Sequence, residues 1–409
     1  MFLVSEDLRK ELGKSFRLAY PVVLTQLGMM LMGVVDTWMV GDLGAVALGA
    51  VALGNGLVGS FIFAAAGVLM ALDAMCGQLF GAGRRRRLGY IIWQGYWIGI
   101  VLGLPFNLLF LDIKWLLEIF GQNEGMAEAT SAYLFARSFS ALPIMIFAAQ
   151  RAFLSGIGNT RAILHAAIWA NIANAIADWA LIYGHWGAPR LGLEGAGYAT
   201  SICSFVMCLV GTFTIHRGHY GREYGLKFVA PDWEVIKRIL KLGIPFALHL
   251  FVEIGGFTVA AFLAGLLGDI ALGAHQVAMT FASLTYMVPL GISVAASVRV
   301  AQAVGANRLD EANLAAKVAM YMGTTFMVLA GLTFLAIPEF LASIFVSKTE
   351  LVALAASLIQ IAAVFQVSDG IQVVAAGCFR GVGDTKTPFF MNFAAHWLVG
   401  IPLGIGLAF

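Results

Sequence analysis

The stretch LGAVALGA at residues 43–50 recurs almost unchanged as LGDIALGA at residues 267–274, which lie 224 positions later. Two further pairs keep the same offset: LAYP at 18–21 over LGIP at 242–245, and GQLFGAGR at 77–84 over AQAVGANR at 301–308. Towards the end of the repeat, SGIGNTR at 155–161 matches RGVGDTK at 380–386 with an offset of 225. The chain is therefore an internal duplication.

The composition is that of a membrane protein, because 60% of the residues are hydrophobic, only 12% are charged and the mean hydropathy is +0.86. Apolar runs recur that are long enough to cross about 30 Å of hydrocarbon as helices. We predict eleven spans, at residues 18–40, 46–72, 90–111, 129–153, 162–183, 195–215, 243–267, 272–298, 314–337, 351–378 and 388–408. The runs lack the apolar and polar alternation of barrel strands, so the predicted fold class is an all-α polytopic membrane protein.

Each repeat should hold six spans, so both repeats enter the membrane from the same side and form two pseudo-symmetric six-helix bundles. We expect an N-terminal lobe at 1–217, a cytoplasmic linker at 218–241 and a C-terminal lobe at 242–409. The sixth helix of the first repeat, at 195–215, has its counterpart near positions 420–440, beyond Phe409. We expect that the sequence stops short of a twelfth span, and a protein of eleven spans is the alternative.

Basic residues gather in alternate loops, which predicts the orientation of the chain. The basic residues in the other set of loops, on the opposite side of the membrane, are only Lys114, Arg190 and Lys348. The N-terminus is therefore expected to be cytoplasmic, without a cleaved signal peptide. The run RRRR at 84–87 acts as a topology anchor in this interpretation, and no nucleic-acid partner is needed to explain it.

Two groups of polar residues fall inside predicted spans, where an ionised side chain is costly unless it faces a cavity or a partner. In the first lobe, Asp36 is joined by Asn174 and Asp178, which stand at i and i+4 on one helical face, and by Thr200. In the second lobe, Glu253 and Asp369 are expected at a similar depth. Carboxylate, amide and hydroxyl oxygens suit Na⁺ or a shared proton.

The duplication places Ala260, not an acid, at the position equivalent to Asp36, so the two acidic groups are not copies of each other. This favours a functional role for each group. The alternative is structural: a buried carboxylate can cap a broken helix or pair with Arg137 or a histidine.

Enzyme signatures are weak. GNGLVG at 54–59 fits a nucleotide-binding pattern but lies inside a predicted span, where close helix packing explains its glycines. The sequence contains no Walker A motif, no HExxH and no GxSxG, and its four cysteines stand singly in apolar runs. We therefore expect a protein that is not an enzyme, has no cofactor and does not use ATP.

Several motifs together resemble the MATE (multidrug and toxic compound extrusion) family, most closely its NorM-type bacterial branch. They are PVVLTQLGMMLMGVVDTWMVGDLGAVALGA from residue 21, GQLFGAG from 77, LSGIGNTR from 154, LGIPFALHLFVEIGG from 242 and FRGVGDTKTP from 379. The resemblance covers essentially the whole chain. It implies a cation-coupled antiporter that exchanges H⁺ or Na⁺ for cationic amphipathic drugs or toxins by alternating access between two lobes.

The resemblance also assigns residues to sites. Asp36, Asn174, Asp178 and Thr200 would form the first coupling site, and Glu253 and Asp369 the second, with Na⁺ possible at Asp36, Asp178, Glu253 and Asp369. Phe365 stands where some NorM-type members carry a tyrosine, so this position offers no hydroxyl ligand. We expect a monomer in the lipid bilayer of the bacterial inner (plasma) membrane.

Two other functions stay open at this point. A lipid-linked oligosaccharide flippase of a related fold would need several basic residues in its cleft for the pyrophosphate, whereas Arg137 is the basic residue placed deep within a span. An inactive or truncated transporter would follow if the twelfth span were absent from the protein.

Overall fold

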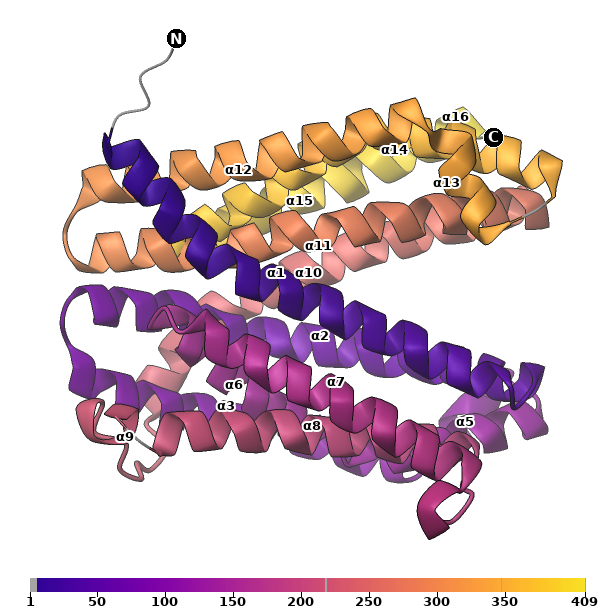
Figure 1. Cartoon of the computed structure of the whole chain (residues 1–409), viewed down its shortest axis with the longest axis horizontal. Helices are drawn as coiled ribbons and strands as arrows, with labels where there is room; N and C mark the ends of the chain where they lie inside the picture. The colour runs from indigo at the N-terminus through magenta and orange to yellow at the C-terminus, as the bar shows by residue number, and fades with distance from the viewer. Residues whose placement is uncertain (1–5, 218, 347, 409) are drawn as a thin grey trace. The chain divides into compact units, whose positions relative to one another are not determined.

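The computed structural model of the chain describes residues 6–217, 219–346 and 348–408, and the regular elements in these ranges are helices (Figure 1). The helices form two compact units, each with its own packing. The first unit is Leu24–Ala247, and the second unit comprises the described parts of Met1–Val23 and Leu248–Phe409. The lobe boundaries expected from the duplication concern repeats, not packing, and stay a prediction.

The first unit contains the second half of α1 (Glu6–Gly41) and the start of α10 (Trp233–Leu266). Between them lie α2 (Ala45–Gly81), α3 (Arg85–Leu111), α4 (Lys114–Ile119), α5 (Glu124–Ser138), α6 (Ala141–Gly156), α7 (Thr160–Tyr183), η1 (His185–Gly187), α8 (Leu193–His216) and α9 (His219–Glu223). In Figure 1, α7 and α8 run side by side as an antiparallel hairpin.

The second unit contains the rest of α10 and the start of α1. Its other elements are α11 (Asp269–Gly305), α12 (Leu309–Ala336), α13 (Pro338–Phe345), α14 (Thr349–Val382), α15 (Lys386–Phe393), the π-helical turn η2 (Ala394–Gly400) and α16 (Ile401–Ala408). The helices α11, α12 and α14 pack on one another and form the body of this unit.

In the described part of the chain, nine helices are long and apolar enough to cross a membrane, or ten if the bent pair of α5 and α6 forms one span. The eleven predicted spans therefore need two corrections. The run at 162–183 is the 24-residue helix α7, which is not among these apolar helices because of its polar residues, including Asn174 and Asp178. Its length of about 36 Å is nevertheless that of a span.

The run at 129–153 is not one straight helix, because α5 and α6 meet at a bend of 48°. Pro143 explains the break, since a proline has no N–H to donate to the carbonyl of Phe139, four residues earlier. Phe139 and Ser140 lie between the two helices. The apolar pattern does not reveal this break, because hydropathy reports the composition of a run and not the direction of its helix axis.

Small residues allow the helices to approach closely, as is usual in membrane proteins. In the first unit, a Cβ atom on Gly195 of α8 would lie 2.7 Å from the backbone of Leu181 on α7. In the second unit, a Cβ atom on Gly377 of α14 would lie 2.3 Å from the carbonyl oxygen of Ser293 on α11. Any larger residue at either position would therefore push two helices apart.

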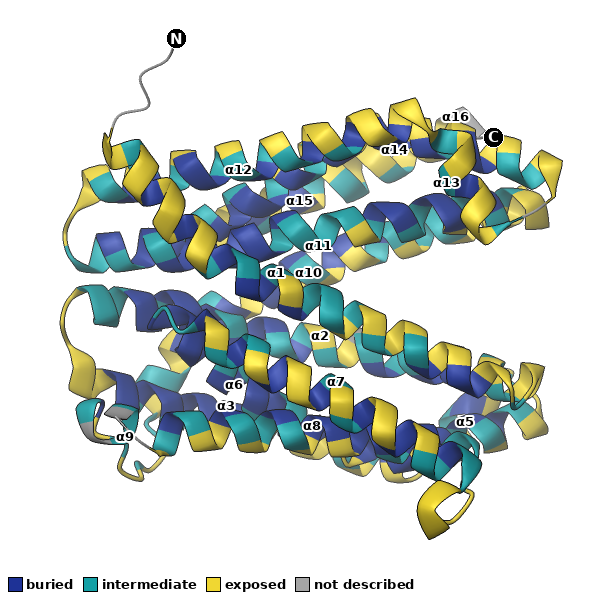
Figure 2. Cartoon of the chain, viewed as in Figure 1, coloured by how far each residue is buried: buried dark blue, intermediate teal, exposed yellow. Residues whose placement is uncertain are grey.

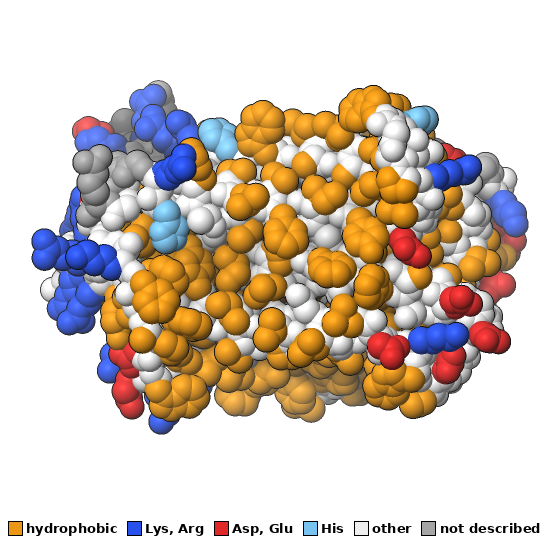
Figure 3. All heavy atoms as spheres, turned by 90° about the horizontal axis from the view of Figure 1, so that it is seen from below, with side chains coloured by type: hydrophobic (Ala, Val, Ile, Leu, Met, Phe, Trp, Pro, Cys, Tyr) orange, Lys and Arg blue, Asp and Glu red, His pale blue; other side chains and the backbone are white. Residues whose placement is uncertain are grey.

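Large apolar side chains cover the outside of the helices, while the faces turned to neighbouring helices are buried (Figure 2). Figure 3 shows one largely hydrophobic face, with Lys and Arg gathered at one end and most of the visible Asp and Glu at the other. A water-soluble protein would not expose so much continuous apolar surface. The pattern is that of a protein surrounded by lipid.

The division between the two units falls inside two continuous helices. In α1 it follows Val23, two residues after Pro21, and in α10 it follows Ala247, two residues after Pro245. These prolines occupy equivalent positions in the two repeats, 224 residues apart. The duplication has thus placed the same helix-weakening residue beside each division.

Candidate functional site

The acidic group of the first unit forms where α1 lies parallel to α7. The position of a Cβ atom on Gly28 would be 3.6 Å from the side chain of Asn171, and the Tyr183 hydroxyl donates to the carbonyl oxygen of Met39 at 3.0 Å. Between these two contacts, Asp36 of α1 comes level with Asp178 of α7. The carboxyl groups of Asp36 and Asp178 and the amide of Asn174 lie close enough to influence one another electrostatically.

These polar groups are buried but poorly satisfied. Asp178 is 0% exposed, and Asp36 and Asn174 are also buried. Among the described residues, neither oxygen of Asp178, nor Oδ1 of Asp36, nor Nδ2 of Asn174 has a hydrogen-bond partner. Buried polar atoms normally find partners, and two adjacent carboxylates without donors repel each other if both are ionised. The arrangement is therefore suited to hold a proton or a cation.

Arg137 of α5 lies within electrostatic range of Asp36. Its Nη1 donates to the Tyr133 hydroxyl at 2.6 Å and to the Asn55 side chain, and its guanidinium lies 5.8 Å from the centre of the Tyr133 ring. Within the described residues, no ion pair joins Arg137 to Asp36, and its Nε is buried without a partner. The structural alternative, in which Arg137 neutralises the acid through an ion pair, does not describe this geometry.

Thr200 of α8 is buried in the same unit. Its hydroxyl donates to the carbonyl oxygen of Ala196 within its own helix at 3.0 Å. No hydrogen bond between Thr200 and either carboxyl group is found among the described residues. The structure thus brings Asp36, Asn174 and Asp178 together, while Thr200 retains only its acceptor capacity for a ligand.

The acidic group of the second unit lies where α10, α11 and α14 meet. The Tyr286 hydroxyl on α11 donates to Oε1 of Glu253 on α10 at 2.7 Å. Asp369 of α14 is close enough to interact electrostatically with Glu253 and with Tyr286. Glu253 is buried, and Asp369 is partly exposed. The two acids predicted from the sequence are thus neighbours in this structure.

A second set of contacts holds the other oxygen of Glu253. Oε2 lies 3.5 Å from Nε2 of His249, one turn earlier on α10, and 3.5 Å from Nδ2 of Asn392 on α15. The same amide nitrogen lies 3.1 Å from Nδ1 of His249. Trp397 lies in the π-helical turn η2, which follows Asn392. Its Nε1 donates a hydrogen bond to the carbonyl oxygen of Val252 on α10 at 3.0 Å. Glu253 therefore sits in a network of polar contacts, unlike Asp178.

The sequence alone does not single out Tyr286, Asn392 or His249 as members of this group. The spacing of His249 and Glu253, four residues apart on one helical face, was a usable signal for their contact. Tyr286 and Asn392 gave no such signal, because their contacts cross between helices. From the sequence, Arg137 is a possible ion-pair partner and the basic residue deep within a span, but its contacts with Tyr133 and Asn55 could not be predicted.

The chemistry of both groups fits a proton or a monovalent cation better than a transition metal. Among the described residues, no group of three or more His, Cys, Asp or Glu side chains could hold a metal ion. The acids instead come in pairs, Asp36 with Asp178 and Glu253 with Asp369. Oxygen ligands in this number suit a weakly held cation that must also leave.

The MatE family model matches residues 21–180 and 245–405, which correspond to the two repeats. The Multidrug resistance protein MdtK of Yersinia enterocolitica is 34% identical over 390 residues, which cover 95% of this chain and 85% of that protein. MdtK of Yersinia pestis is 33% identical over the same coverage.

Solved structures agree on the fold. The eukaryotic MATE transporter AtDTX14 superposes with a TM-score of 0.90 at 22% identity, covering 99% of this chain and 90% of that one. A MATE protein in complex with MaL6 gives 0.88 at 18% identity, covering 100% and 91%. Together with the family model over both repeats, these matches confirm the resemblance seen in the sequence, and the chain belongs to the MATE family of membrane transporters.

Proposed function

We propose that this protein exports cationic amphipathic drugs or toxins in exchange for H⁺ or Na⁺. The observation that carries the proposal is the buried pair of Asp36 and Asp178, in which three carboxylate oxygens have no hydrogen-bond partner among the described residues. The names of the MdtK relatives support a multidrug substrate range. These relatives also support a place in the bacterial inner membrane, and the distribution of basic residues supports a cytoplasmic N-terminus.

The exchange follows from competition for negative charge. When the first-unit pair is ionised, its carboxylates attract a cationic substrate or Na⁺, because three of their four oxygens have no hydrogen-bond donor among the described residues. A proton or Na⁺ that occupies the pair reduces this attraction and favours release of the substrate. The occupants therefore exclude one another at Asp36 and Asp178.

Glu253 and Asp369 form a second coupling site with different properties. Tyr286, His249 and Asn392 already contact Glu253, so this acid is held in a fixed position. Asp369 is less buried and is the more accessible member of the pair. Phe365 offers no hydroxyl, whereas Tyr286 of α11 donates one to Glu253.

Coupling by alternating access also requires that the ion and the substrate favour different conformations, since a ligand with equal affinity for both shifts nothing. The coupling ion should favour the conformation that releases substrate outward. The inward gradient of the coupling ion then returns the carrier to the conformation that is open to the cytoplasm.

Efflux from proteoliposomes tests the proposal when a pH gradient and an Na⁺ gradient are imposed separately. A gradient of the coupling ion should drive export of a cationic dye by the parent protein, and Asp36→Asn and Glu253→Gln should each abolish it at equal protein content. Asp112→Asn, which changes an exposed aspartate at the end of α3, is the matched control and should export normally. Parent-like efflux by both Asp36→Asn and Glu253→Gln would reject these acids as coupling groups.

A further inference from the structure

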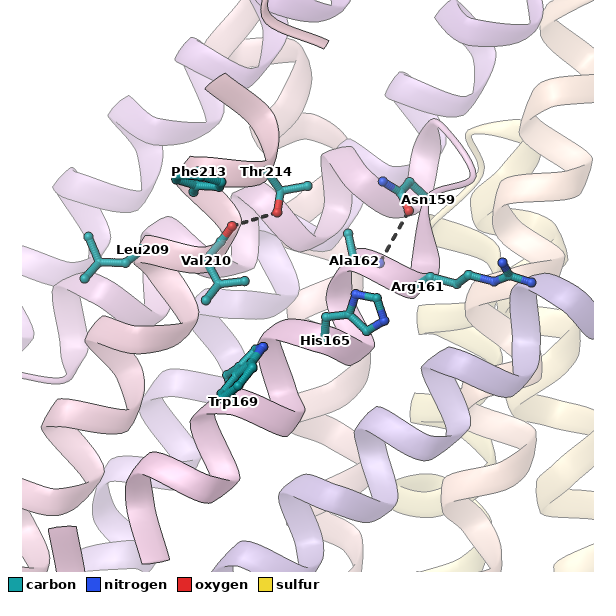
Figure 4. A pocket seen from close by; sticks show the side chains of 9 residues that line it. All are labelled: Asn159, Arg161, Ala162, His165, Trp169, Leu209, Val210, Phe213 and Thr214. Carbon is teal, nitrogen blue, oxygen red and sulfur yellow. Dashed lines mark hydrogen bonds between the residues drawn. The ribbon is translucent and has the colours of Figure 1, made fainter. Parts of the chain in front are cut away.

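Two histidines of the long helices differ in their surroundings. His165 of α7 is exposed in an open hollow of about 580 Å³ between α7 and α8, near Trp169 (Figure 4). No acidic side chain is among the described residues that line this hollow. His249 of α10 is instead 2% exposed, and its Nε2 lies 3.5 Å from Oε2 of Glu253, one turn later on the same helix. Of the two histidines, it is therefore His249 that can share a proton with an acid.

Asn392 of α15 determines how the hydrogens around His249 are arranged. Its Nδ2 lies 3.1 Å from Nδ1 of His249, and 3.5 Å from both the carbonyl oxygen of His249 and Oε2 of Glu253. A carbonyl oxygen and an ionised carboxylate only accept hydrogen bonds, so the amide nitrogen, and not the amide oxygen, must face them. Nδ1 of His249 then faces an N–H group and accepts from it. The ring hydrogen of neutral His249 is therefore on Nε2, which faces Glu253.

This arrangement surrounds the carboxyl group of Glu253 with hydrogen-bond donors. Tyr286 of α11 donates to Oε1 at 2.7 Å, and the nitrogens of His249 and Asn392 lie beside Oε2. A hard cation such as Na⁺ is bound by several oxygen atoms, and the positive ends of these N–H groups repel it from Oε2. Glu253 is thus poorly placed to hold Na⁺, in contrast to Asp178, neither of whose oxygens has a partner among the described residues.

The amide oxygen of Asn392 indicates how an added proton is accommodated. Oδ1 of Asn392 is buried and has no hydrogen-bond partner among the described residues. Buried amide oxygens normally have a partner, so this atom is free to accept one. When Nδ1 of His249 gains a hydrogen, the Asn392 amide can turn over, and Oδ1 then accepts from Nδ1. The acceptor that a hydrogen on Nδ1 needs is therefore already in place.

We propose that His249 and Glu253 form a proton-binding dyad, which makes the second coupling site carry H⁺ and not Na⁺. The proposal rests on the proposed function and identifies the coupling ion at one of its two sites. Uptake adds one proton and removes the single negative charge of the dyad, while no bond between heavy atoms changes. Before uptake, one hydrogen lies between Nε2 and Oε2, on Nε2. After uptake, Nδ1 carries a hydrogen as well, and the hydrogen between Nε2 and Oε2 can lie on either atom.

Charged and titratable groups on neighbouring elements favour a shared proton over a charge on either partner alone. Those within electrostatic range of the dyad are Asp369 and Arg380 of α14, Tyr286 of α11 and His396 of η2. Arg380 opposes a positive charge on the His249 ring, and Asp369 opposes a negative charge on Glu253. A proton shared between the ring and the carboxyl group leaves the dyad neutral and avoids both repulsions.

Histidine NMR of the full-length chain in nanodiscs tests the dyad without a transport measurement. With isotope-labelled histidine, His249→Gln identifies the His249 signals. At alkaline pH the ring hydrogen should be on Nε2, and acidification should add a hydrogen at Nδ1. Replacing Na⁺ by N-methylglucamine at constant ionic strength should leave the signals unchanged. A ring hydrogen on Nδ1 at alkaline pH, or a shift of the His249 signals with Na⁺, would overturn the proposal.

Asn392→Asp tests the hydrogen arrangement in a side chain of nearly the same shape. Its carboxylate offers Nδ1 of His249 an acceptor in place of a donor, so the ring hydrogen should move to Nδ1 even at alkaline pH. A ring hydrogen that stays on Nε2 in this variant would contradict the arrangement on which the dyad depends.

Dye efflux from proteoliposomes tests the role of the dyad in coupling. His249→Gln keeps an N–H group near Glu253 but cannot take up a proton, so export driven by a pH gradient should fall about tenfold or more. The melting temperature and the equilibrium binding of the dye should stay at the parent values, whereas a merely structural role would lower the melting temperature. The matched control His165→Gln makes the same change in the open hollow and should export as the parent does.

The results separate failure of the dyad from failure of the proposed function. If a pH gradient drives export equally by the parent and by His249→Gln, the dyad is wrong and the proposed function stands. If no gradient drives export by the parent, the proposed function is wrong, and the NMR signals of His249 alone decide whether the dyad exists.

Discussion

Tyr286 donates a hydrogen bond of 2.7 Å to Oε1 of Glu253, and this contact joins α11 to α10 inside the second unit. Hydrogen bonds to charged groups contribute about 1.5–3 kcal/mol, so Tyr286→Phe should reduce coupled efflux about tenfold or more. The reason is that Glu253 loses the hydroxyl that positions it towards Asp369. Initial rates of dye export from proteoliposomes measure the effect.

Tyr321→Phe controls for the loss of a hydroxyl, because Tyr321 is 70% exposed on α12. It should export at the parent rate. If Tyr286→Phe also exports at that rate, the hydrogen bond does not contribute to coupling.

Asp178→Asn separates a structural role from a functional one. Both oxygens of Asp178 are buried without a partner among the described residues, so the carboxyl group contributes no hydrogen bond that an amide would lose. The melting temperature in detergent should therefore not fall below that of the parent, because an unpaired buried carboxylate does not stabilise a fold. Efflux should nevertheless fall about tenfold or more, as for loss of a charge-assisted contact to the cation. A marked loss of thermal stability would instead assign Asp178 a structural role.

Arg137→Gln should strengthen equilibrium binding of a cationic dye to the first unit. The guanidinium lies within range of Asp36 and repels any cation bound there. Its removal should improve affinity about fivefold, which corresponds to about 1 kcal/mol of relieved repulsion. Fluorescence polarisation measures the change. Arg137→Lys preserves the charge and should bind as the parent does, and so should Arg190→Gln in the exposed loop before α8. Weaker binding by Arg137→Gln would contradict the repulsion.

The start of α10 should depend on pH through Asp232. The hydrogen bond from the Tyr90 hydroxyl, together with those from the amides of Glu234 and Val235, holds the pKa of Asp232 below its ordinary value of 3.8. A lowered pKa means that the cap is fully formed above pH 3.8 and is lost as the pH falls through the lower, folded-state value. Hydrogen exchange of the first turn of α10 should therefore be slow at neutral pH.

In Asp232→Asn, exchange in this first turn should be faster at neutral pH, because an amide oxygen is a weaker acceptor than a carboxylate. Glu234→Gln, two residues away, removes the same charge without removing the cap and should exchange as the parent does. Equal exchange in both variants would show that Asp232 does not fix the start of the helix.

The sequence predicted most helices because lipid-spanning runs are long and apolar, and the repeat made the prediction consistent across both halves. It failed at 129–153 because hydropathy is insensitive to the bend that Pro143 introduces between α5 and α6. The sequence also predicted an apolar span at α7, although this helix carries several polar residues. Two of the residues that lower the hydropathy of α7, Asn174 and Asp178, also belong to the first acidic group.

The candidate residues were predictable to the extent that an acid inside an apolar run is conspicuous. Asp36, Asp178 and Glu253 could be found in this way. Tyr286 and Asn392 could not, because their contact with Glu253 depends on how α11 and α15 are rotated about their axes. Thr200 is buried, and its hydroxyl donates to the carbonyl oxygen of Ala196, four residues earlier, as threonines inside helices commonly do.

Pro21 and Pro245, which lie beside the two divisions, make α1 and α10 easier to bend at these points. Neither Pro21 nor Pro245 can donate to the carbonyl four residues earlier, so each helix is most compliant where it passes from one unit to the other. Each acidic group lies beyond this joint on the same helix, Asp36 15 residues after Pro21 and Glu253 eight residues after Pro245. In both repeats, the acid and the proline joint therefore belong to one continuous helix, an arrangement that the duplication produced at Pro21 and again at Pro245.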